Sequence, residues 1–211
     1  MIVEPDHLIV GCATLDAGIE HIARLTGATP IAGGRHSMMG THNAVMKLGP
    51  KLYVELIAID PDAPPPPRPR WFELDQPAMR AAIAERPHLI AWAARTDDLD
   101  DALMRATIAP GVAMPMTRGE LTWRITVPED GMRPAGGVLP VLIQWTGDTH
   151  PAEGLPESGV TLATLAASHP SPGLVREALA AWKLGGALSV THAATPRVAA
   201  MLRTPRGLVA I

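Results

Sequence analysis

The sequence predicts an α+β fold built from a repeated module. One strand, one helix and three strands follow one another in residues 1–60, and the same order recurs in residues 87–147. A proline-rich link, residues 61–70, separates these two copies, because proline removes a backbone donor and interrupts regular structure. A third, partial copy follows in residues 148–211. We therefore expect two paired modules in residues 1–147, with the third packed on the same body.

The first module begins with an apolar strand at residues 3–12 that leads directly into an amphipathic helix. Thr14 or Asp16 can accept a hydrogen bond from the first free amides of this helix, and Gly27 is typical of its end. Three further strands are expected at residues 29–32, 41–48 and 51–60, with turns at 33–36 and 49–50.

The second and third modules repeat this order after a short helix near residues 76–85. Asp97 and Asp98 are expected to cap the helix of the second module, and a strand beginning at Val160 opens the third. The strands expected in these modules cover residues 88–96, 112–117, 121–127, 138–146, 188–191, 198–203 and 207–211.

Composition excludes several classes of function. The formal net charge of −3 provides no basic surface for nucleic acid, and no apolar run approaches the ~18 residues that a membrane-spanning helix needs. The N-terminus lacks the pattern of a signal peptide, so we expect a cytoplasmic protein. A single cysteine, Cys12, excludes an intrachain disulfide and is interpreted as an inert buried thiol.

Short motifs accompany the repeated module. They are Asp6-His-Leu8, Gly33-Gly-Arg-His36, Gly40-Thr-His-Asn43, Tyr53-Val-Glu-Leu56 and Pro140-Val-Leu-Ile-Gln-Trp145. With the modules, they resemble the vicinal oxygen chelate superfamily and, within it, the glyoxalase-like domain family. The resemblance implies that two modules pair into one cupped mixed sheet with helices outside and a small oxygen-rich ligand inside the cup.

The resemblance leaves two classes of function open, because the superfamily includes isomerases, dioxygenases, transferases and metal-free binding proteins. One is a lyase, isomerase or oxygenase in which Glu55 acts as general base or metal ligand with His7 beside it. The other is a binding protein that sequesters a small molecule without catalysis. A homodimer is one candidate assembly.

Metal-dependent members of the superfamily hold a divalent ion with one ligand from the first strand and one from the fourth strand of each module. His7 and Glu55 match both positions of the first module, and Gln144 matches the fourth-strand position of the second. Aligning the helix starts places Ala91 opposite His7, whereas His88 lies three residues away and faces the other side. A Ni, Zn, Fe, Co or Mn ion held by His7, Glu55 and Gln144 would thus have a single anionic ligand.

Glu55 needs a partner whether or not a metal is bound. Strand periodicity places Glu55 on one face with Tyr53 and Ile57, where an unpaired carboxylate would cost several kcal/mol. A metal shared with His7 is one solution. A hydrogen bond or salt bridge is the other, with the candidate donors Arg35, His36, His42 and Arg118.

The rim of the cup offers candidate ligand-binding groups. Arg35, His36, His42 and Asn43 flank the second and third strands, where they either recognise a carboxylate, carbonyl or phosphate or cap turns and pair with Glu55. After Arg35, Arg118 is the second candidate residue for binding an anionic group of the ligand.

Tryptophans are the main aromatic residues of the second module. Trp92, Trp123 and Trp145 come from three different strands, and they either wall the ligand cup or fill the core between sheet and helices. His150 precedes Pro151 and is interpreted as part of the linker to the third module.

Overall fold

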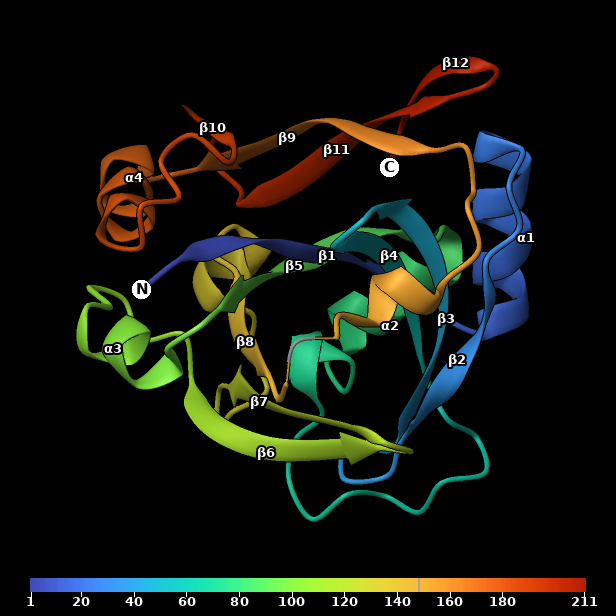
Figure 1. The fold of residues 1–211 in the computed structure, drawn as a ribbon, viewed down its shortest axis with the longest axis horizontal. Coiled ribbons are helices and arrows are strands. Elements are labelled where there is room, and N and C mark those ends of the chain that lie inside the picture. The colour runs from blue at the N-terminus through green and yellow to red at the C-terminus, as the bar shows by residue number, and fades with distance from the viewer. Residues whose placement is uncertain (148) are drawn as a thin grey trace.

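The structure, a computed structural model, describes residues 1–147 and 149–211. It is an α+β protein with a strongly curled mixed sheet and a second, smaller sheet at the C-terminal end (Figure 1). The first module contains β1 (Val3–Gly11), α1 (Leu15–Thr26), β2 (Ile31–His36), β3 (Thr41–Gly49) and β4 (Leu52–Ile59). The second contains β5 (His88–Thr96), α3 (Leu99–Met104), β6 (Val112–Arg118), β7 (Leu121–Val127) and β8 (Val141–Trp145).

The eight strands of the two modules form one sheet in the order β2-β3-β4-β1-β5-β8-β7-β6. In each module the first strand runs parallel to the fourth, and β1 pairs antiparallel with β5 to join the two halves. The predicted cup of paired modules is confirmed. Helices α1 and α3 lie on its convex side, and the side chain of Thr14 caps α1 as expected.

The segment between the modules fills one end of the concave face. It contains a short 3-10 turn, η1 (Trp71–Glu73), and α2 (Pro77–Glu85). Its buried apolar side chains are Trp71, Phe72, Leu74, Met79 and Ile83, and they form one cluster with Ile9 and Ile57 of the sheet. The His36 ring packs edge-on against Trp71, with ring centroids 5.1 Å apart, so this segment borders the polar side chains of the concave face.

Residues 33–36 are part of β2, so the predicted turn at this position is wrong. The pairing of β2 with β3 shifts between Ala32 and Arg35, which places the two glycines in a bulge. A Cβ atom at Gly33 would collide with the Asn43 side chain, and one at Gly34 with Arg118. The glycines are needed here because two polar side chains of the concave face pack directly against the backbone.

The C-terminal sheet contains β9 (Thr161–His169), α4 (Pro172–Ala181), β10 (Ser189–His192), β11 (Arg197–Thr204) and β12 (Gly207–Ala210). Its strand order is β10-β9-β11-β12, so its first strand lies between its second and third instead of beside its fourth. The 3-10 turns η2 (Pro134–Gly137) and η3 (Pro151–Gly154) lie before β8 and before β9. The expected start of this module, residue 148, lies outside the described residues.

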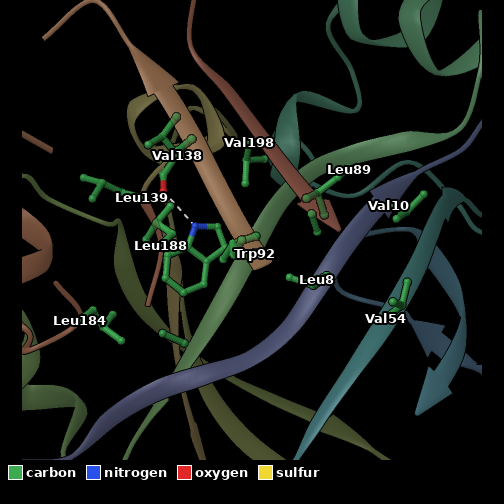
Figure 2. Close-up of a cluster of buried hydrophobic side chains, with 14 of the residues drawn as sticks. Leu8, Val10, Val54, Leu89, Trp92, Val138, Leu139, Leu184, Leu188 and Val198 are labelled. Atoms are coloured by element: carbon green, nitrogen blue, oxygen red, sulfur yellow. Dashed lines mark hydrogen bonds between the residues drawn. The ribbon is translucent and has the colours of Figure 1, made fainter. Parts of the chain in front are cut away.

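The second sheet covers the convex face of the cup over β1 and β5 (Figure 2). Val198 and Leu188 share this core with Leu8 and Trp92. The indole nitrogen of Trp182 donates a hydrogen bond to the Ala102 carbonyl of α3 at 2.9 Å, which ties α4 to the second module. No helix among the described residues is long and apolar enough to cross a membrane.

Trp92 belongs to this outer core and does not line the cup. It is fully buried, and its Nε1 donates to the Val138 carbonyl at 2.9 Å (Figure 2). The prediction that Trp92 walls the ligand site is wrong because strand alternation turns it to the convex face, whereas Ala91 and Ala93 face inward.

Replacing Trp92 by alanine should lower the free energy of unfolding by about 3–5 kcal/mol, because it leaves a large cavity and an unpaired Val138 carbonyl. Urea denaturation followed by circular dichroism measures this change. Leu174→Ala is the control, since Leu174 is exposed on α4 and should change stability by less than about 0.5 kcal/mol. Equal stability of the two variants would contradict the assignment of Trp92 to the core.

Candidate functional site

Glu55 is the centre of a polar cluster on the concave face. Asn43 Nδ2 donates a hydrogen bond to Glu55 Oε1 at 2.5 Å. His7 Nε2 lies 3.5 Å from Oε2, and His36 Nε2 lies 3.7 Å from Oε1. These groups come from β1, β2, β3 and β4 and are all at least nine-tenths buried. The partners that Glu55 requires are therefore His7, His36 and Asn43.

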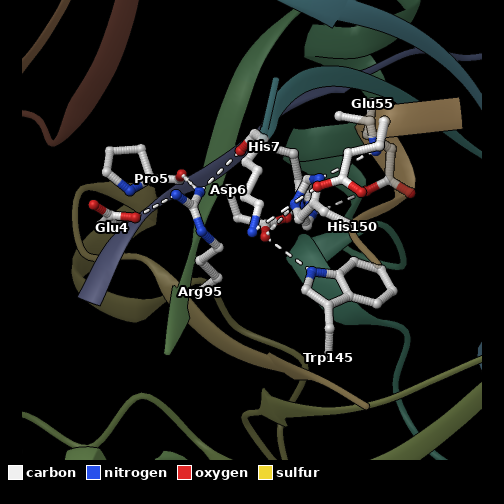
Figure 3. Close-up of polar contacts among 11 residues, drawn as sticks. Glu4, Pro5, Asp6, His7, Glu55, Arg95, Trp145 and His150 are labelled. Carbon is white, nitrogen blue, oxygen red and sulfur yellow. Dashed lines mark hydrogen bonds and ion pairs between the residues drawn. The ribbon is translucent and has the colours of Figure 1, made fainter. Parts of the chain in front are cut away.

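Asp6 is a buried residue of this cluster that the sequence analysis missed. Its carboxylate accepts hydrogen bonds from His7 Nδ1 at 2.6 Å, Trp145 Nε1 at 2.9 Å and His150 Nε2 at 2.9 Å (Figure 3). In a regular strand Asp6 and His7 would face opposite sides. The pairing of β1 with β5 shifts between Pro5 and His7, and this irregularity allows both side chains to join one cluster. A sequence signal did exist, since Asp-His is the only polar pair in an apolar strand.

The cluster separates the charge states of its two histidines. Burial opposes the charge of His7, but the hydrogen bond and charge of Asp6, together with the charge of Glu55, raise the pKa of its imidazole. Burial also opposes ionisation of Asp6, yet the hydrogen bonds from His150 and His7 hold the pKa of this carboxyl far below its usual range. In His36 burial dominates and lowers the pKa to about 4. The raised pKa therefore favours the protonated form of His7, whereas His36 is neutral near pH 7.

Arg35 and His42 face away from this cluster, and the structure does not bring them together with Asn43 and Glu55. Arg35 forms ion pairs with Asp60 at 3.2 Å and Asp62 at 2.9 Å, and its side chain is 60% exposed. His42 lies opposite Arg35 in the β2–β3 register and alternates with the inward-facing Asn43. A side chain that already contacts two carboxylates is a poor anchor for an anionic ligand.

Gln144 also lies outside the cluster, so its prediction as a metal ligand is wrong. Its Nε2 donates to the Asp97 carbonyl at 2.8 Å, and its Oε1 accepts from the Leu99 amide at 3.3 Å. Gln144 therefore caps α3 on the convex side. The residues of β8 that face the cup are Val141, Ile143 and Trp145. His88 lies at the start of β5, where its Nδ1 contacts the Arg86 carbonyl at 2.9 Å.

A cavity of about 300 Å³ borders the polar cluster. Tyr53 and Arg118 form its inner wall: the Tyr53 ring stacks on His7 at 4.7 Å, and Arg118 Nη1 donates to Asn43 Oδ1 at 3.3 Å. The Arg118 guanidinium also lies 5.9 Å from the centre of the Trp123 ring. Within residues 1–147 and 149–211, no carboxylate forms an ion pair with Arg118.

Trp123 and Trp145 lie on the concave side, with ring centroids 5.2 Å apart. Trp145 also lines a second cavity of about 340 Å³, and Thr149 and His150 belong to the walls of both cavities. Trp145 therefore lines a cavity and Trp123 packs behind it on the same face, whereas Trp92 lies on the convex side.

The model of the glyoxalase-like domain family matches residues 6–183, which include both paired modules and α4. The chain belongs to the glyoxalase-like domain family. This membership and the curled sheet confirm the resemblance to the vicinal oxygen chelate superfamily.

Several solved structures are similar to this chain at low sequence identity. A hypothetical protein from Staphylococcus aureus superposes with a TM-score of 0.55 and 16% identity, over 86% of this chain and 75% of that one. Methylmalonyl-CoA epimerase from Mycobacterium tuberculosis has a TM-score of 0.43 and 18% sequence identity, over 69% of this chain and 88% of that one. A variant of the Streptomyces coelicolor epimerase in complex with 2-nitronate-propionyl-CoA has a TM-score of 0.44 and 17% sequence identity, over 72% of this chain and 100% of that one. No curated protein matches this chain in sequence.

The glyoxalase-like cup of this chain does not fit the four-ligand metal site that the resemblance implied. Only the first module contributes donors, because the inward-facing residues of β8 are apolar. One oxygen of Glu55 is already bonded to the Asn43 amide. No group of three or more His, Cys, Asp or Glu side chains in the described part of the chain is arranged to hold an ion.

Divalent metals should therefore not stabilise this glyoxalase-like protein through His7 and Glu55. An ion that binds only the folded state would raise stability by about 2.7 kcal/mol at 100 times its dissociation constant. Melting temperatures with Ni²⁺, Zn²⁺, Co²⁺, Fe²⁺ or Mn²⁺ should equal those with EDTA, in the wild type and in Glu55→Gln alike. A metal-dependent increase that Glu55→Gln abolishes would contradict the donor arrangement described above.

The neutral His36 should make the protein less stable as the pH falls from about 6.5 to about 4. In this range the unfolded chain binds a proton at His36 and the folded chain does not. The difference between 6.5 and about 4 corresponds to roughly 3 kcal/mol. The raised pKa of His7 adds no slope here, since its contribution is complete below pH 6.5 and decreases only as the pH rises through its folded pKa.

Urea unfolding at several pH values measures this slope. His36→Gln should remove most of it, since the lowered pKa of the partly exposed His21 adds a smaller slope of the same sign, whereas His192→Gln, at an exposed histidine of β10, should keep it. Identical slopes for His36→Gln and the wild type would show that His36 is protonated in the folded protein.

Proposed function

We propose that the protein is an isomerase or lyase that transfers a proton at a carbon next to a carbonyl group of a small anionic ligand. The chain of buried groups from Asp6 through His7 to Glu55 carries this proposal. Asp6 contacts His7 Nδ1 at 2.6 Å, and Glu55 lies 3.5 Å from His7 Nε2. Buried charges are costly and rarely improve stability over an apolar core, so a set of three favours a chemical role.

Glu55 is the general base in this proposal. It accepts the proton of the substrate C–H bond, and the electron pair of that bond moves to the carbonyl oxygen as an enolate. Protonated His7, the form that its raised pKa favours, presents Nε2–H close to Glu55, where it stabilises the negative oxygen. In an isomerase Glu55 returns the proton to a different position, and in a lyase a leaving group departs from the neighbouring carbon.

Arg118 anchors the anionic group of the ligand. It lines the 300 Å³ cavity, and Asn43 connects it to Glu55, since Asn43 Oδ1 accepts from Arg118 while Asn43 Nδ2 donates to Glu55. An anion bound at Arg118 would therefore lie one asparagine side chain away from the base. Val45, Leu121 and Leu155 add an apolar wall to the same cavity, whose volume suits a small molecule.

A binding protein without catalysis is the second candidate, and the apolar wall of the cavity next to Arg118 favours it. The cavity ends at Tyr53 and Arg118 and does not include Glu55 among its lining residues. Catalysis therefore requires the Tyr53 ring or residues 149–155 to move when the ligand enters, whereas simple binding does not. Apo catalytic sites commonly assume their working geometry only in the complex, so this arrangement does not exclude catalysis.

Proton exchange distinguishes the two candidates. A panel of small 2-oxo, 2-hydroxy and 2-alkyl acids is incubated with the protein in D₂O, and ¹H NMR follows loss of the signal of the acidic carbon. The wild type should exchange at least one compound, and Glu55→Gln should slow that exchange by about 100-fold or more. Glu20→Gln, at an exposed glutamate of α1, is the control.

Two outcomes would contradict the enzyme proposal. Equal exchange by Glu55→Gln and the wild type would remove Glu55 as the base. Saturable binding of a compound, detected by calorimetry and lost in Arg118→Met, without any exchange would favour the binding protein.

A further inference from the structure

We propose that His150 is a positioning residue that locks Asp6 onto His7 and thereby directs His7 Nε2 toward Glu55. His150 lies between β8 and β9, after the two paired modules, at the start of the 3-10 turn η3. This inference rests on the proposed proton transfer and adds to it a residue from outside the paired modules. It assigns to the segment after β8 a part in the chemistry of the cup.

The two oxygens of Asp6 have separate partners. Oδ2 accepts from Trp145 Nε1 and from His150 Nε2, each at 2.9 Å, while Oδ1 accepts from His7 Nδ1 at 2.6 Å (Figure 3). Two donors on Oδ2 fix the plane of the carboxylate and leave Oδ1 aimed at His7. Because His7 Nδ1 is held in this way, the opposite nitrogen of the ring, Nε2, faces Glu55.

His150 is itself held in a defined state by its own turn. The Ala152 amide donates to His150 Nδ1 at 3.1 Å, so the ring proton required for the Asp6 bond is on Nε2. The His150 ring packs edge-on against Tyr53 and Trp145, each with centroids 5.9 Å apart. It is 3% exposed, and Asp6 is fully buried, so water does not compete for this hydrogen bond.

The same segment supports His7 from a second side. Ala152 packs with Tyr53 and Val45 in a small apolar cluster, and the Tyr53 ring stacks on His7 at 4.7 Å. His150 acts on Nδ1 of His7 through Asp6, whereas Ala152 supports the ring face through Tyr53. Both effects arise from one short stretch of chain, which favours a positioning role over simple filling of space.

Two substitutions separate these roles. His150→Phe keeps an aromatic ring in the site but removes the donor to Asp6, and His150→Gln keeps an N–H donor but removes the ring. If His150 only fills space, the phenylalanine variant should behave like the wild type. If His150 positions Asp6, the glutamine variant should retain the hydrogen bond from His7 Nδ1 to Asp6, and the phenylalanine variant should not.

The readout is the His7 ring, observed in the full chain with ¹⁵N-labelled histidine by long-range ¹H–¹⁵N NMR. The wild type should show a low-field, exchange-protected Nδ1 proton on His7. His150→Phe should lose this protected signal, His150→Gln should keep it, and His192→Ala, at an exposed histidine, should leave it unchanged. A His7 spectrum in folded His150→Phe that equals the wild type would overturn the proposal. So would loss of the signal in folded His150→Gln together with its retention in His150→Phe.

This measurement needs no substrate, so it is independent of the proposed activity. A His7 response to His150→Phe without deuterium exchange of any compound would support positioning while the proposed function fails. Deuterium exchange by the wild type with an unchanged His7 spectrum in His150→Phe would support the function and overturn the positioning role. Where an exchanging compound is found, His150→Phe should lower its exchange rate by about 100-fold, and His150→Gln should restore most of it.

Discussion

A fully buried carboxylate is tolerated only when its lone pairs are met by hydrogen-bond donors, and Asp6 imposes this requirement on the whole cup. Its three donors come from β1, from the end of β8 and from the segment that follows β8. Removal of any one would leave part of a charge unpaired at zero exposure, where the cost is several kcal/mol. One carboxylate thus holds together the first module, the second module and the chain beyond them.

The two modules share a topology but not a chemistry. Glu55 of β4 is surrounded by His7, His36 and Asn43, whereas the inward residues of β8 are Val141, Ile143 and Trp145. Because backbone pairing and the apolar cores on its two faces maintain the paired sheet, the second module needs no polar residue at the matching positions. Trp145 nevertheless contributes an indole N–H to Asp6. The second module therefore supplies an apolar wall with one hydrogen-bond donor, while the first module contains the charged groups.

The largest apolar core and the residues of the candidate site lie on opposite faces of the curled sheet. The convex face is covered by α1, α3 and the C-terminal sheet in one continuous apolar core that contains Trp92 and Trp182. The concave face contains a smaller apolar cluster with Trp71 and α2, and beside it the charged cluster around Glu55. The large outer core can offset the cost of burying charges, since each buried leucine or tryptophan contributes several times the net value of one hydrogen bond.

The sequence by itself determined the modules, the helix ends, the sheet face of Glu55 and the need of that carboxylate for a partner, because these depend on local periodicity and on capping. Tertiary structure decided which side chains meet. An irregularity where β1 pairs with β5 brings Asp6 and His7 into one cluster, strand alternation turns Gln144 and Trp92 outward, and the distant His150 completes the site. The physical reason is that strand faces alternate with every residue, so a register shift of one position reverses them, and only pairing with a neighbouring strand sets that register.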